Sequence, residues 1–514
     1  MKVVGFPTQG EVVQFVFDAS GVLPRKYEKD DSFDEARKKS TQTALRRLAN
    51  EVGQLDPNLG KLLVTFSYLI SGVLPAREFW AFGDVFFDLF DTYRYALRTD
   101  GTYLTKSETA KWFLLESAAP RLAISLAKHL QRYNVAADDL LVPADPFWYL
   151  PKQDGDDWQW PLERVMRWAY ELVGTSIQRF HCPDDADLAL LGKNLESAKN
   201  WLAGRNLPSW SSLLRNFDES FEALDRFRAK QGLPSLPEQQ KVSIRTALFL
   251  SRAATYVSTL VLKHFGAETL QEFCSRHCLV AELVVDDTQR VREFVHQLIA
   301  REHLPPSEWD KVWFEVVTDY WHKFVARQDL MSQAVASGCL TVNEAIEETR
   351  AFGGLAALQF ERPDAFAPQH AIPDGFAELL LDGLAARESS DLSISSIETY
   401  RARLENRGLT RALPWMVPWQ RSTYYYREQK YAEAFQCIQE AYECAQYCAG
   451  AHQGVLVNQY IELAAKTDRW REFTQGIHWA TYLGLETRWL RKEPPTDENL
   501  KFAFEVLKRA VYSD

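Results

Sequence analysis

The chain has 514 residues, of which 46% are hydrophobic, and a formal net charge of -11. This length predicts two to four domains that each bury a core, and the composition excludes a disordered chain. The negative charge argues against a protein that coats nucleic acid without sequence preference. Seven cysteines, an odd number spread over a long chain, indicate reduced thiols rather than a disulfide framework.

Neither a secretory signal nor a membrane span is expected. The first 15 residues lack the apolar run of about 7 to 15 residues that a signal requires. The best candidate for a span, residues 62–74, contains Ser and Tyr and is too short to cross a bilayer. We therefore expect a cytoplasmic protein without membrane association.

Apolar residues at helical spacing dominate the N-terminal part of the chain. Short strands are expected only at 3–6 and 11–17, before helices over 34–55, 60–70, 76–96 and 106–133. The stretch 141–161 is dense in Pro, Asp and aromatic residues, which favours irregular structure and a domain boundary. A first N-terminal helical domain is thus predicted over residues 1–140.

Helical spacing resumes after this boundary. The predicted helices cover 162–178, 211–230, 241–265, 270–283, 289–301 and 308–336. Pro305 and Pro306 separate the last two, and order weakens over 353–396, which predicts an exposed, protease-sensitive connection. The pattern predicts an all-α, multi-domain protein. Its domains after the first are expected at 161–230, 238–352 and 396–514.

The stretch 188–214 has the most specific pattern in the chain. Gly192 follows an apolar run, where a left-handed residue would end a short helix. A second helix is predicted from Ser197 to Ala203, because its apolar residues recur at i, i+3 and i+4. Gly204 then ends this helix and Pro208 begins the next, which gives three short helices around one small core.

Residues 181–228 resemble the helix-turn-helix of the Cro and lambda-repressor (XRE-like) family. The turn Gly, helix Trp, post-helix Gly and Pro-Ser pair of that family recur as Gly192, Trp201, Gly204, Pro208 and Ser209. The resemblance implies that a helix over 195–203 enters the major groove of DNA. It places Ser197, Lys199 and Asn200 near base edges. It places Lys193 and Arg205 near phosphates.

Three residues depart from the family pattern. Lys193 and Ala198 stand where the family usually has apolar and branched aliphatic side chains, and Glu196 places an anion where phosphates would approach. Two interpretations stay open. Either Leu195 takes over the packing role, or the helices have kept the fold and lost the ligand.

The C-terminal region has a second pattern. Tyr431, Ala434, Ile438 and Ala441 alternate large and small residues at i, i+3, i+7 and i+10, and part of this alternation recurs 39 residues later. The region 396–514 therefore resembles a degenerate tetratricopeptide-like array. The resemblance implies stacked helical hairpins that bind a peptide or a partner helix.

Two groups of cysteine and histidine have the spacing of one helix face. They are Cys274, His277 and Cys278, and Cys437, Cys444, Cys448 and His452. The first lacks a fourth ligand, and Gly450 is predicted to end the second helix before its histidine. We expect structural thiols, no metal and no cofactor. The chain also lacks a phosphate loop, a dinucleotide fingerprint, a zinc-protease helix and a nucleophile elbow, so no enzymatic activity is expected.

These patterns predict a DNA-binding regulator, or an accessory DNA-recognition subunit of a prokaryotic multi-protein system such as a phage-defence or mobile-element complex. The region 396–514 would bind a protein partner. The alternative is a non-enzymatic helical scaffold or adaptor, regulated by partner binding or by cleavage within 353–396, without nucleic-acid binding. An enzyme whose site is assembled from scattered residues is a third possibility.

Overall fold

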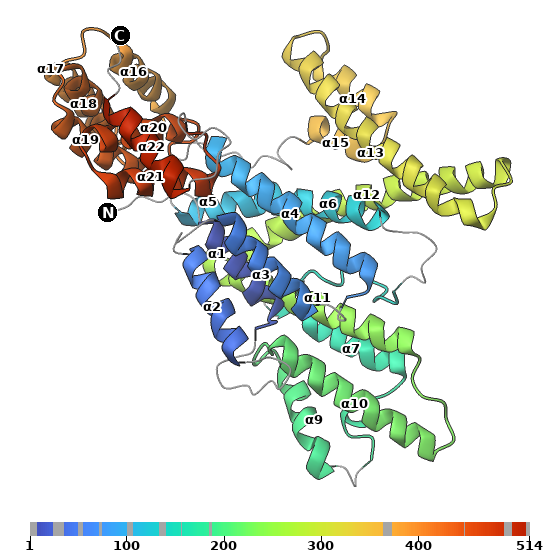
Figure 1. Ribbon diagram of the computed structural model, residues 1–514. Coiled ribbons are helices and arrows are strands. Elements are labelled where there is room, and N and C mark those ends of the chain that lie inside the picture. Colours follow the sequence, from blue (N-terminus) through green and yellow to red (C-terminus); the bar gives the residue numbers. More distant parts are fainter. Residues whose placement is uncertain are drawn as a thin grey trace.

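The computed structural model shows an all-α protein, which confirms the predicted fold class. It describes residues 8–23, 35–49, 55–70, 74–99, 106–132, 140–155, 157–184, 188–362, 373–446, 448–487 and 496–509. In Figure 1 the C-terminal helices gather at the upper left, an arm of helices extends to the upper right, and a third group forms the lower end. No helix within these residues is long and apolar enough to span a membrane.

The N-terminal helices are α1 (Gln9–Ser20), α2 (Glu35–Ala49), α3 (Leu55–Ile70) and α4 (Ala76–Thr99). The strand expected at 11–17 is wrong, because these residues belong to α1. Thr8 and Glu11 form a reciprocal capping box at the start of this helix, and Val13 and Phe17 bury one of its faces. The strand expected at 3–6 lies outside the described residues.

The next elements are α5 (Lys106–Phe113), a π-helical turn (Leu114–Ala118), α6 (Ala119–Arg132), β1 (Lys152–Asp154), β2 (Asp157–Gln159) and α7 (Pro161–Val173). The two strands pair antiparallel in a small hairpin inside the stretch expected to be irregular. Arg164 of α7 holds the chain before this hairpin, since it donates to the carbonyl of Leu150 over 2.9 Å and pairs with the Asp145 carboxylate.

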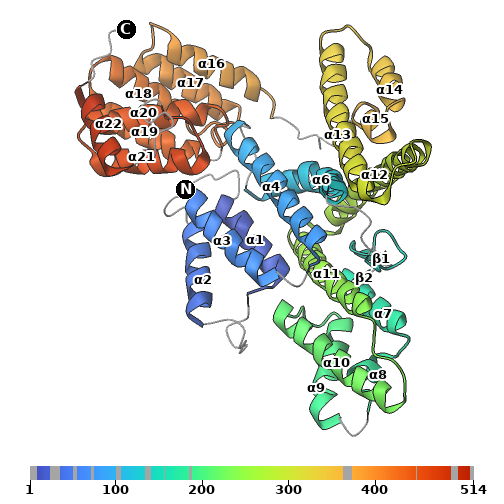
Figure 2. The ribbon, with the colours of Figure 1, turned by 45° about the vertical axis from the view of Figure 1, so that its right-hand side comes forward.

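The middle of the chain folds into helices that range from 5 to 35 residues. They are α8 (Ile177–His181), α9 (Leu188–Leu202), α10 (Trp210–Lys230), α11 (Glu238–Phe265), α12 (Ala267–Arg301), α13 (Pro306–Ala336), α14 (Val342–Arg350) and α15 (Gly354–Glu361). Figure 2 shows α8, α9 and α10 together at the lower end, with α7 and α11 side by side above them. Pro305 and Pro306 separate α12 from α13, as predicted.

One continuous helix, α12, replaces the two helices predicted at 270–283 and 289–301. Asp287, in its middle, is buried and accepts from the backbone N–H groups of Gly354 (3.3 Å) and Leu355 (3.1 Å). A carboxylate of α12 therefore caps the N-terminus of α15. The prediction that order weakens over 353–396 is wrong for α15 and for the helices that follow residue 375. Residues 363–372 lie outside the described residues.

The C-terminal helices are α16 (Phe376–Glu388), α17 (Ile394–Asn406), α18 (Met416–Arg427), α19 (Tyr431–Ala445), α20 (His452–Lys466), α21 (Trp470–Leu483) and α22 (Asp497–Arg509). Consecutive helices from α18 to α21 pack against each other. Ala434, Ile438 and Ala441 are fully buried, and the rings of Tyr442 and Tyr460 stack 4.2 Å apart between α19 and α20. The prediction of packed helix pairs is thus confirmed.

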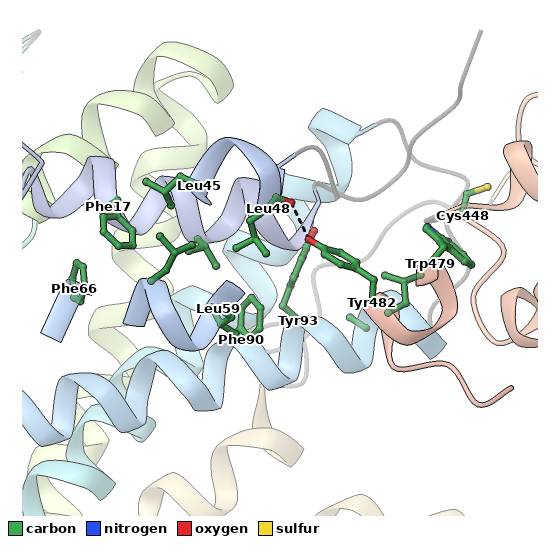
Figure 3. Packing of buried hydrophobic residues seen from close by; sticks show 14 of the residues in the cluster. Phe17, Leu45, Leu48, Leu59, Phe66, Phe90, Tyr93, Cys448, Trp479 and Tyr482 are labelled. Carbon is green, nitrogen blue, oxygen red and sulfur yellow. Dashed lines mark hydrogen bonds between the residues drawn. The ribbon is translucent and has the colours of Figure 1, made fainter. Parts of the chain in front are cut away.

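The C-terminal helices pack back on the N-terminal ones. The hydroxyl of Tyr482 in α21 donates to the carbonyl of Leu48 in α2 over 3.0 Å, and the amide of Gln9 in α1 donates to the carbonyl of Tyr482 over 3.4 Å. Figure 3 shows Tyr482 pointing from α21 toward Leu48, close to Tyr93 of α4. Both ends of the chain therefore contribute to one hydrophobic core.

Candidate nucleic-acid interface

The turn predicted at Gly192 is wrong. Gly192 lies inside α9, a single helix of 15 residues. Leu191, Leu195 and Ala198, at i, i+4 and i+7, are all buried, so one apolar face runs past the glycine without interruption. The burial of Leu195 agrees with the interpretation that this residue takes over the packing role.

The other end of α9 has the expected geometry. Gly204 adopts the left-handed conformation with φ of 63°, and its N–H donates to the carbonyl of Trp201 over 3.0 Å. The N–H of Arg205 donates to the carbonyl of Asn200 over 3.0 Å, which completes a Schellman-type ending. Ser209 caps α10 by accepting from the N–H of Ser212 over 3.2 Å.

The solvent side of α9 brings together most of the predicted contact residues. Lys193, Ser197 and Asn200 follow one another at i, i+4 and i+7, opposite the buried leucines. The Nη1 group of Arg205 donates to Oδ1 of Asn200 over 3.0 Å, so the cation after the helix lies beside this row. Lys199 is exposed but lies about 100° from Asn200 around the helix, on the flank of the row.

A buried hydrogen-bond chain lies behind this helix. Ser220 donates its hydroxyl hydrogen to the carbonyl of Asn216 (2.7 Å), so its oxygen accepts from Nδ1–H of His181 (2.8 Å). Nε2 of His181 then accepts from the hydroxyl of Tyr170 over 2.9 Å. His181 is fully buried and neutral, and burial lowers its pKa to about 3.

This chain fixes α9 as well as its own helices. It joins α7, α8 and α10 through Tyr170, His181 and Ser220. The amide of Asn216 in α10 also donates to the carbonyl of Asn194 in α9 over 3.0 Å. Sequence reasoning missed the network, because its members lie on three different helices and the periodicity within one helix does not show which side chains of separate helices meet.

The loop between α9 and α10 is attached to the N-terminal helices. The buried guanidinium of Arg252, in α11, donates to the carbonyls of Pro208 (3.0 Å) and Asp18 (2.8 Å). The N–H of Trp210 donates to the carbonyl of Gly21 over 2.9 Å. The segment that follows the candidate face is therefore held at both α1 and α11.

The histidine of the first cysteine and histidine group makes hydrogen bonds inside the core. Nδ1 of His277 donates to the carbonyl of Ala119 over 2.9 Å, and Nε2 accepts from the hydroxyl of Tyr149 over 2.8 Å. Burial raises the pKa of the thiols of Cys274 and Cys278 to about 12 and about 11. Both histidine nitrogens are thus used inside the core, and the neighbouring thiols remain protonated at neutral pH.

The second group does not form one helical stripe. Gly450 adopts the left-handed conformation after α19 has ended at Ala445, and His452 belongs to α20. Its ring lies 5.6 Å from the ring of Trp415. No set of three or more His, Cys, Asp or Glu side chains in the described part of the chain is arranged to hold a metal ion.

No protein-family model matches the chain, and no curated protein or solved structure is significantly similar to it. The candidate face on α9 therefore rests on its geometry.

Proposed function

We propose that the protein binds double-stranded DNA through the outer face of α9 and acts as a DNA-binding regulator or as the DNA-recognition subunit of a larger assembly. The row formed by Lys193, Ser197 and Asn200 carries this proposal, because it lies on the solvent side of a helix whose opposite side is anchored in the core. A helix fixed in this way can present side chains to a major groove without itself reorganising.

The local charge supports the proposal. Between residues 188 and 206 the chain has three cations, Lys193, Lys199 and Arg205, and one anion, Glu196, although the whole chain has a net charge of -11. In the proposed complex Lys193 and Arg205 contact phosphates and Ser197 and Asn200 lie near base edges, whereas Lys199 reaches the DNA from the flank of the row. A segment of locally positive charge on an acidic body would limit non-specific binding and leave affinity to the sequence-selective contacts.

The C-terminal helices would supply a second binding function. We propose that α16–α22 form a tetratricopeptide-like array that binds a peptide or a helix of a protein partner. The packing of α18, α19, α20 and α21 in sequence order supports this proposal, since such stacks create extended surfaces for peptides.

The test of DNA binding compares the wild type with the double variant Lys199→Glu/Arg205→Glu, using fluorescence anisotropy with a pool of random-sequence duplexes. The control, Lys311→Glu/Lys323→Glu, makes the same charge change on exposed residues of α13. We expect the α9 variant to bind at least tenfold more weakly than the wild type. The slope of log K against the logarithm of the salt concentration should become shallower by about 1 to 2, and the control should not change. Equal binding by all three proteins, or binding by none, would reject the proposal.

A further inference from the structure

The exposed side of α4 is aromatic. Trp80, Phe87 and Tyr95 have exposed fractions of 58%, 45% and 62%. At about 100° per residue, these three side chains fall within an arc of about 80°. The fold does not need them, because the opposite side of α4 is already buried: Ala81, Val85, Phe90, Tyr93 and Ala96.

Carboxylates interleave with these rings. Asp84, Asp88 and Asp91 lie on the same side of α4, and the side chain of Asp91 is 73% exposed. Of the α4 positions whose exposure is described, those in the exposed class are Ala76, Trp80, Phe87, Asp91 and Tyr95. None of these is a cation.

The cations near this stripe are partly covered or already face carboxylates. Arg77 lies 2.5 Å from Glu78, and Arg94 lies 4.0 Å from Asp91. From α6, Lys128 lies 3.9 Å from Asp88, while Nε2 of the buried His129 lies 2.7 Å from the same carboxylate. Among these charged side chains the carboxylate of Asp91 is the most exposed.

We propose that the aromatic and acidic stripe of α4, formed by Trp80, Asp84, Phe87, Asp91 and Tyr95, binds a basic amphipathic helix of a protein partner. The rings would cover the apolar side of that helix, and they would attract its Lys and Arg side chains through their negative faces. The carboxylates would pair with the same cations. This surface is separate from α9, and the inference does not depend on DNA binding.

The charge pattern selects this occupant over others. A second copy of the chain would bring Asp91 and Asp84 against the same carboxylates, which destabilises the contact. Nucleic acid and anionic lipid surfaces carry negative charge and would be repelled in the same way. Large exposed apolar side chains gathered on one helix side are typical of protein-binding surfaces.

The test measures how the full chain binds two labelled synthetic helices of equal length. One helix consists of Leu and Lys, and the other of Leu and Glu. Fluorescence anisotropy measures their binding to the wild type, to Trp80→Gln/Phe87→Gln and to Asp91→Lys. Matched controls are Phe294→Gln, at an exposed position of α12, and Asp310→Lys, at an exposed position of α13. Circular dichroism checks that every variant keeps its helix content.

We expect the Leu/Lys helix to bind and the Leu/Glu helix not to bind. Both α4 variants should weaken binding at least tenfold, whereas both controls should stay within twofold of the wild type. The proposal is overturned by equal binding of the two helices, by the absence of Leu/Lys binding, or by α4 variants that bind like the wild type. Sedimentation that shows self-association lost in Trp80→Gln/Phe87→Gln would also overturn it, because the occupant would then be a second copy.

Discussion

The buried neutral state of His181 predicts that the region around α9 loses stability in mild acid. Its pKa is about 3 in the folded protein, against an ordinary value of 6.5. The unfolded chain therefore binds an additional proton between these pH values, and stability falls as pH falls below about 6.5. The slope for one group is about 1.4 kcal/mol per pH unit. A decrease from pH 6.5 to pH 5 thus costs about 2 kcal/mol.

His181→Gln removes this titration, and His264→Gln makes the same change at an exposed position of α11. At pH 7 the first variant should also lose about 1–3 kcal/mol, because Tyr170 and Ser220 lose their partner inside the core. Hydrogen exchange of peptides from α7, α8 and α10, corrected for the intrinsic pH dependence, measures the local free energy of opening.

We expect the wild type and His264→Gln to lose about 2 kcal/mol more than His181→Gln in these peptides between pH 6.5 and pH 5. The same pH dependence in all three proteins would show that His181 does not titrate with folding, and would refute the reasoning. A loss confined to peptides outside α7–α10 would refute it as well.

Two further substitutions test the contacts that hold the helices together. Gly21→Ala should destabilise the junction of α1 and α10 by about 2–3 kcal/mol, because φ is 65° and a Cβ would lie 2.2 Å from Cζ of Arg252. Gly155→Ala, with φ of 62° and open space around it, should cost only about 1 kcal/mol in a thermal or urea unfolding assay; equal losses would contradict the role given to Arg252. Asp287→Ala should speed hydrogen exchange at the start of α15 by about tenfold, since two backbone N–H groups lose their acceptor, whereas the exposed neighbour Asp286→Ala should change it little.

Helical periodicity predicted much of the fold because most helices bury one regular apolar face. The start of α4 at Ala76 and the Pro305–Pro306 break before α13 follow from such local signals. The segment 11–17 misled because its Val and Phe residues are typical of strands, whereas the capping box at Thr8 and Glu11 and the burial of Val13 and Phe17 stabilise a helix.

The error at Gly192 has a similar cause. A glycine inside a helix costs about 1 kcal/mol relative to alanine, which the burial of Leu191 and Leu195 on either side offsets. The local pattern of α9 cannot weigh that gain, because it comes from packing against α7, α8 and α10, which lie outside the helix itself. The same limit hid the role of Arg252, whose partners Asp18 and Pro208 lie 234 and 44 residues away.

The most direct test of the central claim maps where DNA lies on the protein. Ultraviolet cross-linking of the full chain to a random-sequence duplex pool, followed by mass spectrometry, identifies the peptides in contact with nucleic acid. The proposed geometry predicts cross-links within residues 193–205, which contain Lys193, Ser197, Asn200 and Arg205 on or beside the outer face of α9. Cross-links confined to other helices, or none above the level seen with Lys199→Glu/Arg205→Glu, would contradict it.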